Sequence, residues 1–329
     1  MEIVEGVHQL RVPMPSNAVM SGKRAYTLVY LVEDSSGWVL IDSGWNYEEG
    51  WSALKTQLSE VVPNLHDIKT LIVTHFHPDH LGLAGHVKQA TGANLVMHQN
   101  DAPDMRKNNL DIAISPNMNQ NQAWLVRCGA TAEEARQSQP PNRGQDNLIT
   151  NHVIQTPIYK LPESKSLYTI WTPGHSPGHL CIYDYQRKLL FSGDHILPTI
   201  SPNIGLFPFS TSDPLADYQE SLLRTKELDV TVVLPAHEDQ FTNLSSRVDE
   251  LLAHHEARLT EVIQVINEKS YTGFQVAALL TWNSKPWEKM EGLTRFLALG
   301  ETMSHIRHLV NKEIIREGEW DGVAYYSRS

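Results

Sequence analysis

The stretch Thr74–Gly82 reads THFHPDHLG and places three histidines and one aspartate within six residues, from His75 to His80. It directly follows the apolar run Leu71–Val73. Imidazole and carboxylate groups cost desolvation when they are buried without partners, so a packed interior gains nothing from such a density of them. The stretch therefore predicts a functional cluster at the end of a short buried strand, if the rest of the sequence supplies partners.

Three further segments carry metal-binding side chain types after strand-like runs. His175 lies in TPGHSPGH, Asp194 in FSGDH and His237 in VLPAHE, each close to Gly or Pro. In the opening stretch, His75 and His77 are two residues apart, so in extended backbone both rings point to the same side and can reach one cation. These segments are the partners that the opening stretch requires.

The turn at Pro78 directs the next two side chains, Asp79 and His80, toward a second cation. The complete candidate set has seven nitrogen and oxygen ligands and no thiolate: His75, His77, Asp79, His80, His175, Asp194 and His237. Such a set suits two divalent cations, with Zn²⁺ as the first choice and Mn²⁺ or Fe²⁺ as alternatives.

Strand and helix patterns alternate around these segments. Before residue 105 we expect strands at Tyr26–Glu33, Trp38–Ile41, Thr70–Val73 and Leu95–Met97, and helices at Tyr47–Val61 and His80–Thr91. Strands resume at Leu167–Trp171, Leu180–Tyr185, Lys188–Ser192 and Val230–Leu234. The alternation predicts an α/β fold with helices packed on sheets.

Two regions break this rhythm. Residues 105–151 are rich in Asn, Gln and Met, and we interpret them as an inserted helical cap over a substrate cleft, with solvated loops as the alternative. Residues 246–269 have the apolar period of one long amphipathic helix. Beyond it, helices at Phe274–Trp282 and Thr302–Glu313 and two strands at Ile314–Arg316 and Val323–Ser327 suggest a winged-helix module.

Composition limits the classes of function. With 329 residues, the chain exceeds one hydrophobic core of ordinary size, so a large domain with an appended smaller one is expected. The 27 basic and 38 acidic residues give a net charge of −11, which repels polyanions and weighs against a nucleic-acid substrate. Cys128 and Cys181 form no disulfide framework and are expected to be small buried residues.

The location of the protein can also be predicted from composition. No segment approaches about 18 uninterrupted apolar residues, so we expect no membrane span. The opening residues, MEIVEGVHQLRVP, include acidic side chains and no long apolar run, which argues against a signal peptide. A cytoplasmic location is therefore expected.

The histidine and aspartate motifs resemble those of the metallo-β-lactamase-fold hydrolases over roughly residues 1–245. The resemblance implies that one cation is bound by His75, His77 and His175. It implies that the other is bound by Asp79, His80 and His237, with Asp194 bridging the two. Asp42 in LIDSGW matches the family aspartate that orients a ligand by hydrogen bonding.

The same resemblance implies a fold. It is an αββα sandwich with a helical insertion at about 105–151, and the site lies at the sheet edges. Residues 246–329 resemble the linker helix and winged-helix-like domain found after this catalytic unit in some members.

For the chemistry, the resemblance implies two cations about 3.5–4 Å apart that lower the pKa of a bridging water, so that hydroxide attacks a carbonyl carbon or phosphorus. Asp79 could orient this nucleophile or transfer a proton. The expected substrate is a small carbonyl compound, a thioester as in glyoxalase II or a lactone or ester as in lactonases. The apolar stretch Ile196–Phe209 favours an apolar cleft, with a covering loop as the alternative.

Other functions stay open as alternatives. A phosphodiesterase or ribonuclease is one, since an RNA-cleaving relative carries a winged helix, but nine Lys/Arg against ten Asp/Glu from His255 onward give no basic face. A non-catalytic regulatory protein on this scaffold is another. Redox use is disfavoured because di-iron members place a glutamate where this chain has His77 and carry a flavin domain. True β-lactamases of the commonest class lack the full bridging-aspartate pattern.

Several single residues need a structure to decide their role. Gly174–Gly178 matches the G-x-S-x-G nucleophile motif, but the residues after Ser176 lead into a strand-like run where that motif requires a helix. Tyr218 could reach the cleft or pack beneath its helix. The other histidines in question adjoin ligands, end a strand or lie in the tail, where surface or partly buried positions are expected: His179, His195, His98, His254, His255, His305 and His308. Homo-oligomer formation through the C-terminal domain is a further alternative.

Overall fold

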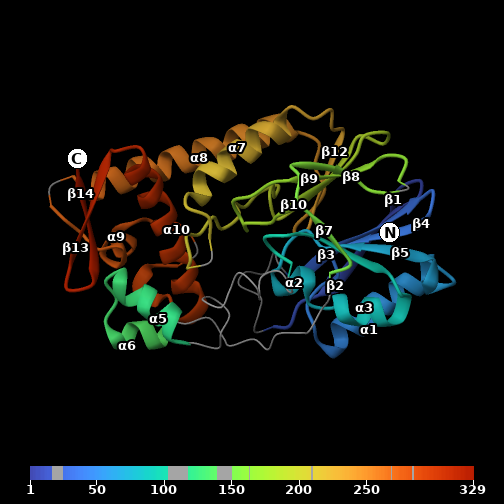
Figure 1. The fold of residues 1–329 in the computed structure, drawn as a ribbon, viewed down its shortest axis with the longest axis horizontal. Coiled ribbons are helices and arrows are strands. Elements are labelled where there is room, and N and C mark those ends of the chain that lie inside the picture. The colour runs from blue at the N-terminus through green and yellow to red at the C-terminus, as the bar shows by residue number, and fades with distance from the viewer. Residues whose placement is uncertain are drawn as a thin grey trace. The chain divides into compact units, whose positions relative to one another are not determined.

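The computed structural model of the protein, drawn in Figure 1, describes residues 1–16, 25–102, 118–138, 150–162, 164–208, 210–267, 269–283 and 285–329. The chain forms two compact units. The first is drawn from the segments Met1–Asn109, Asp146–Pro202 and Ser221–Arg247, and the second from Leu110–Gln145, Asn203–Glu220 and Val248–Ser329. All the candidate ligand residues belong to the first unit.

A seven-stranded sheet forms one half of the first unit. Its order is β1 (Glu2–Val4), β2 (Val7–Pro13), β3 (Tyr26–Asp34), β4 (Gly37–Ile41), β5 (Ile68–Ile72), β6 (Asn94–His98) and β7 (His152–Ile154). The strands from β1 to β4 pair antiparallel, and β3 and β4 form the predicted hairpin. The pairs from β4 to β7 are parallel, so the ends of β4 and β5 point to the same edge.

A five-stranded sheet forms the other half. Its order is β12 (Val232–Pro235), β11 (Leu189–Gly193), β10 (Leu180–Asp184), β9 (Leu167–Trp171) and β8 (Ile158–Lys160). The pair β11 and β12 is parallel, and the remaining pairs are antiparallel. Asp194 and His237 therefore follow two neighbouring strands that run in the same direction.

Two apolar clusters hold the layers together. Between the sheets lie inward-facing side chains of both, including Tyr30 and Ile41 from one sheet and Ile182 and Phe191 from the other. On the opposite face of the larger sheet, its alternate side chains pack with helices α1 (Glu48–Val61) and α3 (Ala84–Thr91). This alternation of side chains between two buried faces explains why residues 28–32 of β3 are apolar at every position.

The segment after β5 differs from the sequence prediction. One helix was expected over His80–Thr91, but the structure has α2 (Pro78–Leu81) and α3, with a break between them. At the break, the Leu83 N–H donates to the Gly44 carbonyl, and the Ser43 N–H donates to the His80 carbonyl. The prediction of one helix was wrong because these backbone groups bind the loop after β4.

The second unit is mainly helical. Its elements are α5 (Met118–Arg127), α6 (Ala132–Gln137), α9 (Gly273–Leu279), η3 (Trp287–Lys289), α10 (Gly292–Asn311), β13 (Ile315–Trp320) and β14 (Val323–Arg328). Helices α7 (Pro214–Lys226) and α8 (Leu244–Val265) contribute residues to both units. A separate apolar cluster that includes Phe274, Phe296 and Ile306 forms its core.

Several predicted boundaries moved. Helix α10 begins at Gly292, ahead of the predicted Thr302, and the domain boundary expected near residue 245 falls within α8. The predicted cap at 105–151 lies outside the described residues at 105–117 and 139–149, while α5 and α6 between them belong to the second unit.

Both cysteines are buried and free, as expected. Among the described residues, no helix combines the length and apolar character that crossing a membrane requires.

Candidate metal centre

The ends of five strands place the candidate ligands. Asp42 follows β4, His75 and His77 follow β5, and Asp79 and His80 lie on α2. On the other sheet, His175 lies between β9 and β10, Asp194 follows β11 and His237 follows β12. The structure brings all seven candidate ligands into three overlapping groups whose donor atoms lie within 4.8 Å of one another.

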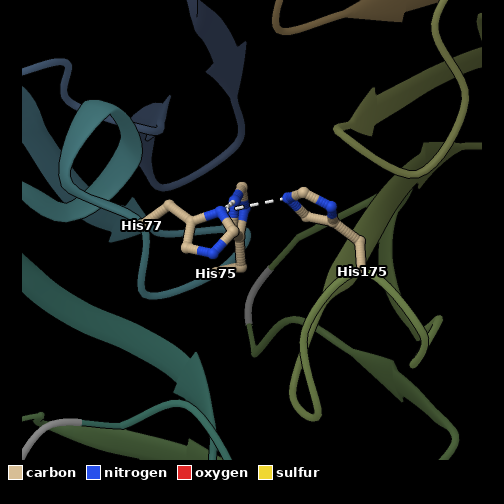
Figure 2. Close-up of side chains that lie close together, drawn as sticks. All are labelled: His75, His77 and His175. Carbon is tan, nitrogen blue, oxygen red and sulfur yellow. Dashed lines mark hydrogen bonds between the residues drawn. The ribbon is translucent and has the colours of Figure 1, made fainter. Parts of the chain in front are cut away.

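Three histidines form the first group. Figure 2 shows the rings of His75, His77 and His175 converging, two from the loop after β5 and one from the loop before β10. The Nδ1 atom of His77 lies 2.9 Å from His75 Nε2 and 3.0 Å from His175 Nε2. Nitrogen ligands of a tetrahedral zinc ion, with Zn–N bonds of about 2.0–2.1 Å, lie about 3.3 Å apart. The three rings are thus close to the spacing that one cation requires.

Asp79, His80 and His237 form a second group. Asp79 Oδ2 lies 3.2 Å from His237 Nε2 and 3.7 Å from His80 Nε2. Asp194 lies between the two groups: its Oδ1 is 3.4 Å from His237 Nε2 and 3.6 Å from His80 Nε2, while its Oδ2 is 3.5 Å from His175 Nε2. One carboxylate therefore turns one oxygen toward each group.

Hydrogen bonds at the far ring nitrogen orient two of these histidines. His80 Nδ1 donates to Asp42 Oδ2 at 2.8 Å, and His237 Nδ1 donates to the Tyr26 carbonyl at 3.1 Å. Because each Nδ1 donates away from the site, each Nε2 points into it, and a cation bound there would take the place of any Nε2 proton. This arrangement is the usual second layer of a metal-binding histidine.

Asp42 itself is held in an unusual backbone conformation. Its φ angle of 63° lies in the left-handed region, which non-glycine residues seldom adopt and Asp and Asn tolerate best. Its carboxylate also accepts from the Thr74 N–H at 2.8 Å and the Thr74 hydroxyl at 3.0 Å. The single carboxylate thereby joins the end of β4 to the start of the THFHPDH loop.

The pKa values of His75 and His77 in the first group are lowered, so these rings are uncharged at neutral pH. Burial, followed by the neighbouring rings, lowers the pKa of His75 well below its ordinary value. Burial and the adjacent His175 lower the pKa of His77 to about 3. These rings therefore offer lone pairs to a cation at neutral pH without first losing protons.

Carboxylates surround His80 of the second group. Burial disfavours the charged form of His80, but three carboxylates, those of Asp42, Asp79 and Asp194, raise its pKa to about 10. The histidines next to Asp79 lower the pKa of that carboxyl, against the opposing effect of burial. Buried carboxylates gathered in this way require a compensating positive charge.

Two orphaned atoms show where a cation fits. His80 Nε2 and Asp194 Oδ1 are buried and have no hydrogen-bond partner within the described structure. Both point at the second group, 3.6 Å from each other. An unpartnered buried polar atom is costly, so a donor set of histidine nitrogens and carboxylate oxygens with such atoms suits divalent cations.

His179 holds Asp194 in place. Its Nε2 accepts from the Asp194 N–H at 3.2 Å, and its Nδ1 contacts the Thr172 hydroxyl at 2.8 Å. Gly193 has a φ of 52°, and a Cβ there would lie 2.7 Å from His179 Nε2. The glycine before Asp194 is therefore required for both the turn and the close approach, and His179 supports the site from behind.

Among the described residues, the remaining candidates lie outside the three groups of donor atoms. Ser176 is buried and its hydroxyl donates to Asp101 at 2.5 Å, and strand β10 follows its loop, so it is not a nucleophile on a strand-to-helix turn. His195 contacts the Thr225 hydroxyl at 3.1 Å. His98 is buried and stacks on Trp171.

Tyr218 and the tail histidines lie in the second unit. Tyr218 has no exposed surface, and its ring packs edge-on against His255. His255, His305 and His308 are buried, which corrects the expected surface or partly buried positions. They pack between helices, where a helical pattern alone does not distinguish a buried polar side from an exposed one.

Several apolar side chains of the stretch Ile196–Phe209 are buried. Ile196, Leu197 and Ile204 have no exposed surface. Leu206 and Phe207 pack against the core of the second unit. That this stretch contributes to an apolar substrate cleft stays a prediction.

Three supporting features were not predicted from the sequence. Asp101, after β6, is fully buried and accepts hydrogen bonds from two ligand loops. The Tyr26 carbonyl orients His237, and Glu238 fixes the segment at Thr199 by accepting from its N–H at 2.9 Å. A lone aspartate or glutamate outside a motif carries no spacing signal, so no sequence pattern could identify these roles.

Comparison with known proteins agrees with this geometry. The family model described as Metallo-beta-lactamase superfamily matches residues 22–237. This is well over half of the chain, so the protein belongs to this superfamily, and it is a metal-dependent hydrolase. The predicted α/β fold class is confirmed.

Similar proteins cover the chain almost completely. It is 26% identical to the probable metallo-hydrolase YqjP of Bacillus subtilis (strain 168), over 99% of this chain and 98% of that one. The crystal structure of a metallo-beta-lactamase family protein from Thermus thermophilus gives a TM-score of 0.79 at 25% identity, over 99% and 100% of the two chains. A beta-lactamase domain protein from Burkholderia ambifaria gives 0.77 at 25% identity, over 100% and 94%. The similarity thus extends through the C-terminal segment.

Proposed function

We propose that the protein is a dinuclear metallohydrolase that cleaves a small carbonyl substrate, a thioester or a lactone or other ester. In this proposal His75, His77 and His175 hold one cation, and Asp79, His80 and His237 hold the other. Zn²⁺ is the proposed metal, because five imidazoles and two carboxylates suit a borderline cation.

The position of Asp194 carries the proposal. Its two oxygens face different groups, 3.5 Å from His175 Nε2 on one side and 3.4 Å from His237 Nε2 on the other. A carboxylate placed in this way supports two cations better than one, since each cation obtains an oxygen ligand. The orphaned Oδ1 atom adds to this support.

When bound, such cations act as Lewis acids toward a carbonyl oxygen and make water acidic enough to supply a nucleophile near neutral pH. Asp79 is the residue of this chain that we propose to orient the nucleophile or receive its proton. Its carboxyl has a lowered pKa and one oxygen 3.2 Å from His237, so it is ionised and fixed in position.

A cleft beside His237 supports a small substrate. It has a volume of about 380 Å³ and is lined by Arg11, Ala25, Tyr26, Leu28, Pro198, Thr199, Glu238, Asp239 and Gln240. Two of its lining residues adjoin His237: Glu238 follows it in the sequence, and the Tyr26 carbonyl lies 3.1 Å from His237 Nδ1. The cleft therefore lies beside this candidate ligand. This volume is in the range of small-molecule sites, about 300–1,000 Å³. A larger hollow of about 650 Å³ is lined by residues of α1 alone, and none of its lining residues adjoins a candidate ligand in the sequence, whereas Glu238 of the smaller cleft does.

For the rest of the molecule, we propose a winged-helix-like role for α9, α10 and the β13–β14 hairpin, and a cytoplasmic location. The proposal for the C-terminal region rests on its order of helices followed by an antiparallel hairpin. Nine basic and ten acidic residues from His255 onward argue against a phosphate-binding face there. Weak, salt-sensitive RNA binding at most is therefore proposed.

The test is a hydrolysis panel of thioesters, lactones and phosphodiesters, run on protein of measured metal content. We expect turnover of a thioester or lactone and a metal content of two per chain. Faster turnover of a phosphodiester would overturn the carbonyl proposal in favour of the phosphodiesterase alternative. A single bound metal in fully active protein would overturn the dinuclear assignment.

A further inference from the structure

Asp101 is a fully buried carboxylate three residues beyond the end of β6. Its Oδ1 accepts from the Gly178 N–H at 2.8 Å. Its Oδ2 accepts from the Ser176 hydroxyl at 2.5 Å and from the Phe76 N–H at 3.3 Å. Each of these three partners is a donor, so the carboxylate serves as the acceptor in all three bonds.

These donors belong to the two loops that carry the three-histidine group. Phe76 lies between His75 and His77, and Ser176 directly follows His175. The carboxylate therefore joins the loop after β5 to the loop before β10, next to the point where His77 Nδ1 and His175 Nε2 lie 3.0 Å apart.

Neighbouring residues hold the same loop from the same side. The Pro177 carbonyl accepts from Asn100 Nδ2 at 3.3 Å and from Trp171 Nε1 at 2.9 Å. Gly178 leaves no room for a side chain, because a Cβ there would lie 2.7–2.8 Å from atoms of Asp101. The segment after β6 is thus closely fitted to the loop that carries His175.

We propose that Asp101 is a positioning residue for the three-histidine group and sets the spacing between His77 and His175. This rests on the two-cation assignment made above. Asp42 has the equivalent role on the other side, since it orients His80 of the second group. Asp42 also reaches His75 through the Thr74 hydroxyl, which lies 3.0 Å from both Asp42 Oδ2 and His75 Nδ1, whereas the bonds of Asp101 given above lead only to the loops of the three-histidine group.

The substitution Asp101→Asn tests this role. An amide would present an NH₂ group to at least one of the donors that now face the carboxylate, which replaces attraction by repulsion. Asp184→Asn is the matched control. Asp184 is equally buried and accepts from the Gln186 and Arg187 N–H groups at 3.1 Å, but it contacts no candidate ligand in these bonds.

The measurement is metal binding by the full chain: titration of the metal-free protein with Co²⁺, followed by absorption, and competition for Zn²⁺ against a chelator. We expect Asp101→Asn to weaken one of two binding events by about 10–100-fold and to change the Co²⁺ spectrum of that event. The other event, and both events in Asp184→Asn, should match the wild type. Ser176→Ala, which removes one of the three donors, should give a smaller shift in the same event and serves if Asp101→Asn does not fold.

Unchanged binding in Asp101→Asn and Ser176→Ala, or an equal loss of both events in Asp101→Asn, would overturn the proposal. If the wild type binds a single cation, the dinuclear function fails, but the comparison still decides the role of Asp101. Weaker binding of that cation in Asp101→Asn alone supports the role, and binding equal to that of Asp184→Asn overturns it.

Discussion

At the scale of the residue, the site depends on what lies behind each ligand. Asp42 fixes the tautomer of His80, and the Tyr26 carbonyl fixes that of His237. A ligand can be recognised from its motif, but its ring is useful only when the far nitrogen is held. The residues behind the ligands therefore determine how well the site is preorganised.

The first prediction concerns the ligands. His77→Ala and Asp194→Ala should reduce turnover by at least about 100-fold while the fold stays largely intact, since removing a ligand exceeds the effect of removing its support. Turnover and metal content should be measured on the purified variants, with circular dichroism to check folding. His152→Ala, a partly buried histidine outside the cluster, is the control. Undiminished hydrolysis by either ligand variant would contradict the assignment.

The second prediction concerns Asp42. Asn tolerates the left-handed conformation observed at φ 63°, so Asp42→Asn removes the charge without adding backbone strain. We expect a loss of about 10–100-fold in metal affinity. Asp42→Ala should lose at least as much affinity and also unfold more easily, by about 1 kcal/mol. Equal metal affinity in Asp42→Asn and the wild type would show that the charge at His80 Nδ1 is unimportant.

At the scale of the element, caps and buried pairs fix the helices of the second unit. Thr272 begins α9 with a capping box: its hydroxyl accepts from the Gln275 N–H at 3.2 Å, and Gln275 Oε1 accepts from the Thr272 N–H at 3.0 Å. Thr272→Ala should lower the free energy of unfolding by about 1 kcal/mol. Urea unfolding measures this, with Thr260→Ala on the exposed side of α8 as the control. A loss no larger than that of the control would show that α9 does not need this cap.

A pair of buried histidines between α8 and α10 predicts a pH dependence. His255 Nδ1 and His305 Nε2 lie 3.1 Å apart. Burial lowers the pKa of His305 to about 4, and burial and His305 lower that of His255 further below its ordinary value. Unfolded histidine has a pKa of about 6.5, so below that pH the unfolded chain binds protons that the folded pair excludes. The contribution of this uncharged pair to the free energy of unfolding is thus fully present above pH 6.5 and is lost as the pH falls toward 4.

The measurement is the free energy of unfolding between pH 7 and pH 5. For each proton excluded, the slope should be about 1.4 kcal/mol per pH unit, and His305→Gln should reduce the total slope by about one such proton. His66→Gln, which changes an exposed histidine, should leave the slope unchanged. A wild-type slope in His305→Gln would contradict the prediction.

Elements with a strong pattern could be predicted from the sequence, and weak ones could not. Strand β3 is long and strand β10 is mostly apolar, and both were expected. Strands β1, β7 and β8 have only three residues each, too few for a period to emerge. The ligand segments could be identified because their residues are closely spaced, whereas Asp101 could not, since its partners are 25 or more residues away in the chain.

At the scale of the whole molecule, the site joins distant parts of the first unit. Its candidate ligands extend from His75 to His237 and lie at the ends of strands from both sheets. The sheets also share an apolar cluster that, among the described residues, contains no candidate ligand. The unit therefore has a source of stability that does not depend on a cation.

Removal of metal should lower stability without unfolding the protein. A cation at 100 times its dissociation constant adds about 2.7 kcal/mol to the folded state. Chelation should therefore lower the melting temperature, and added Zn²⁺ should restore it. Differential scanning calorimetry with and without a chelator measures the shift. His77→Ala should show a smaller shift than the wild type, and an equal shift in both would mean that the metal acts elsewhere.

The distance between the ligands along the chain has a consequence for how the protein matures. A nascent chain that has emerged only as far as His77 holds no complete donor set, because His175, Asp194 and His237 are still to be synthesised. Loading with metal is then expected after translation, into an already folded acceptor. In a cell that lacks the metal, the protein should accumulate in a folded, metal-free and inactive form. Adding the metal should then activate it without new protein synthesis.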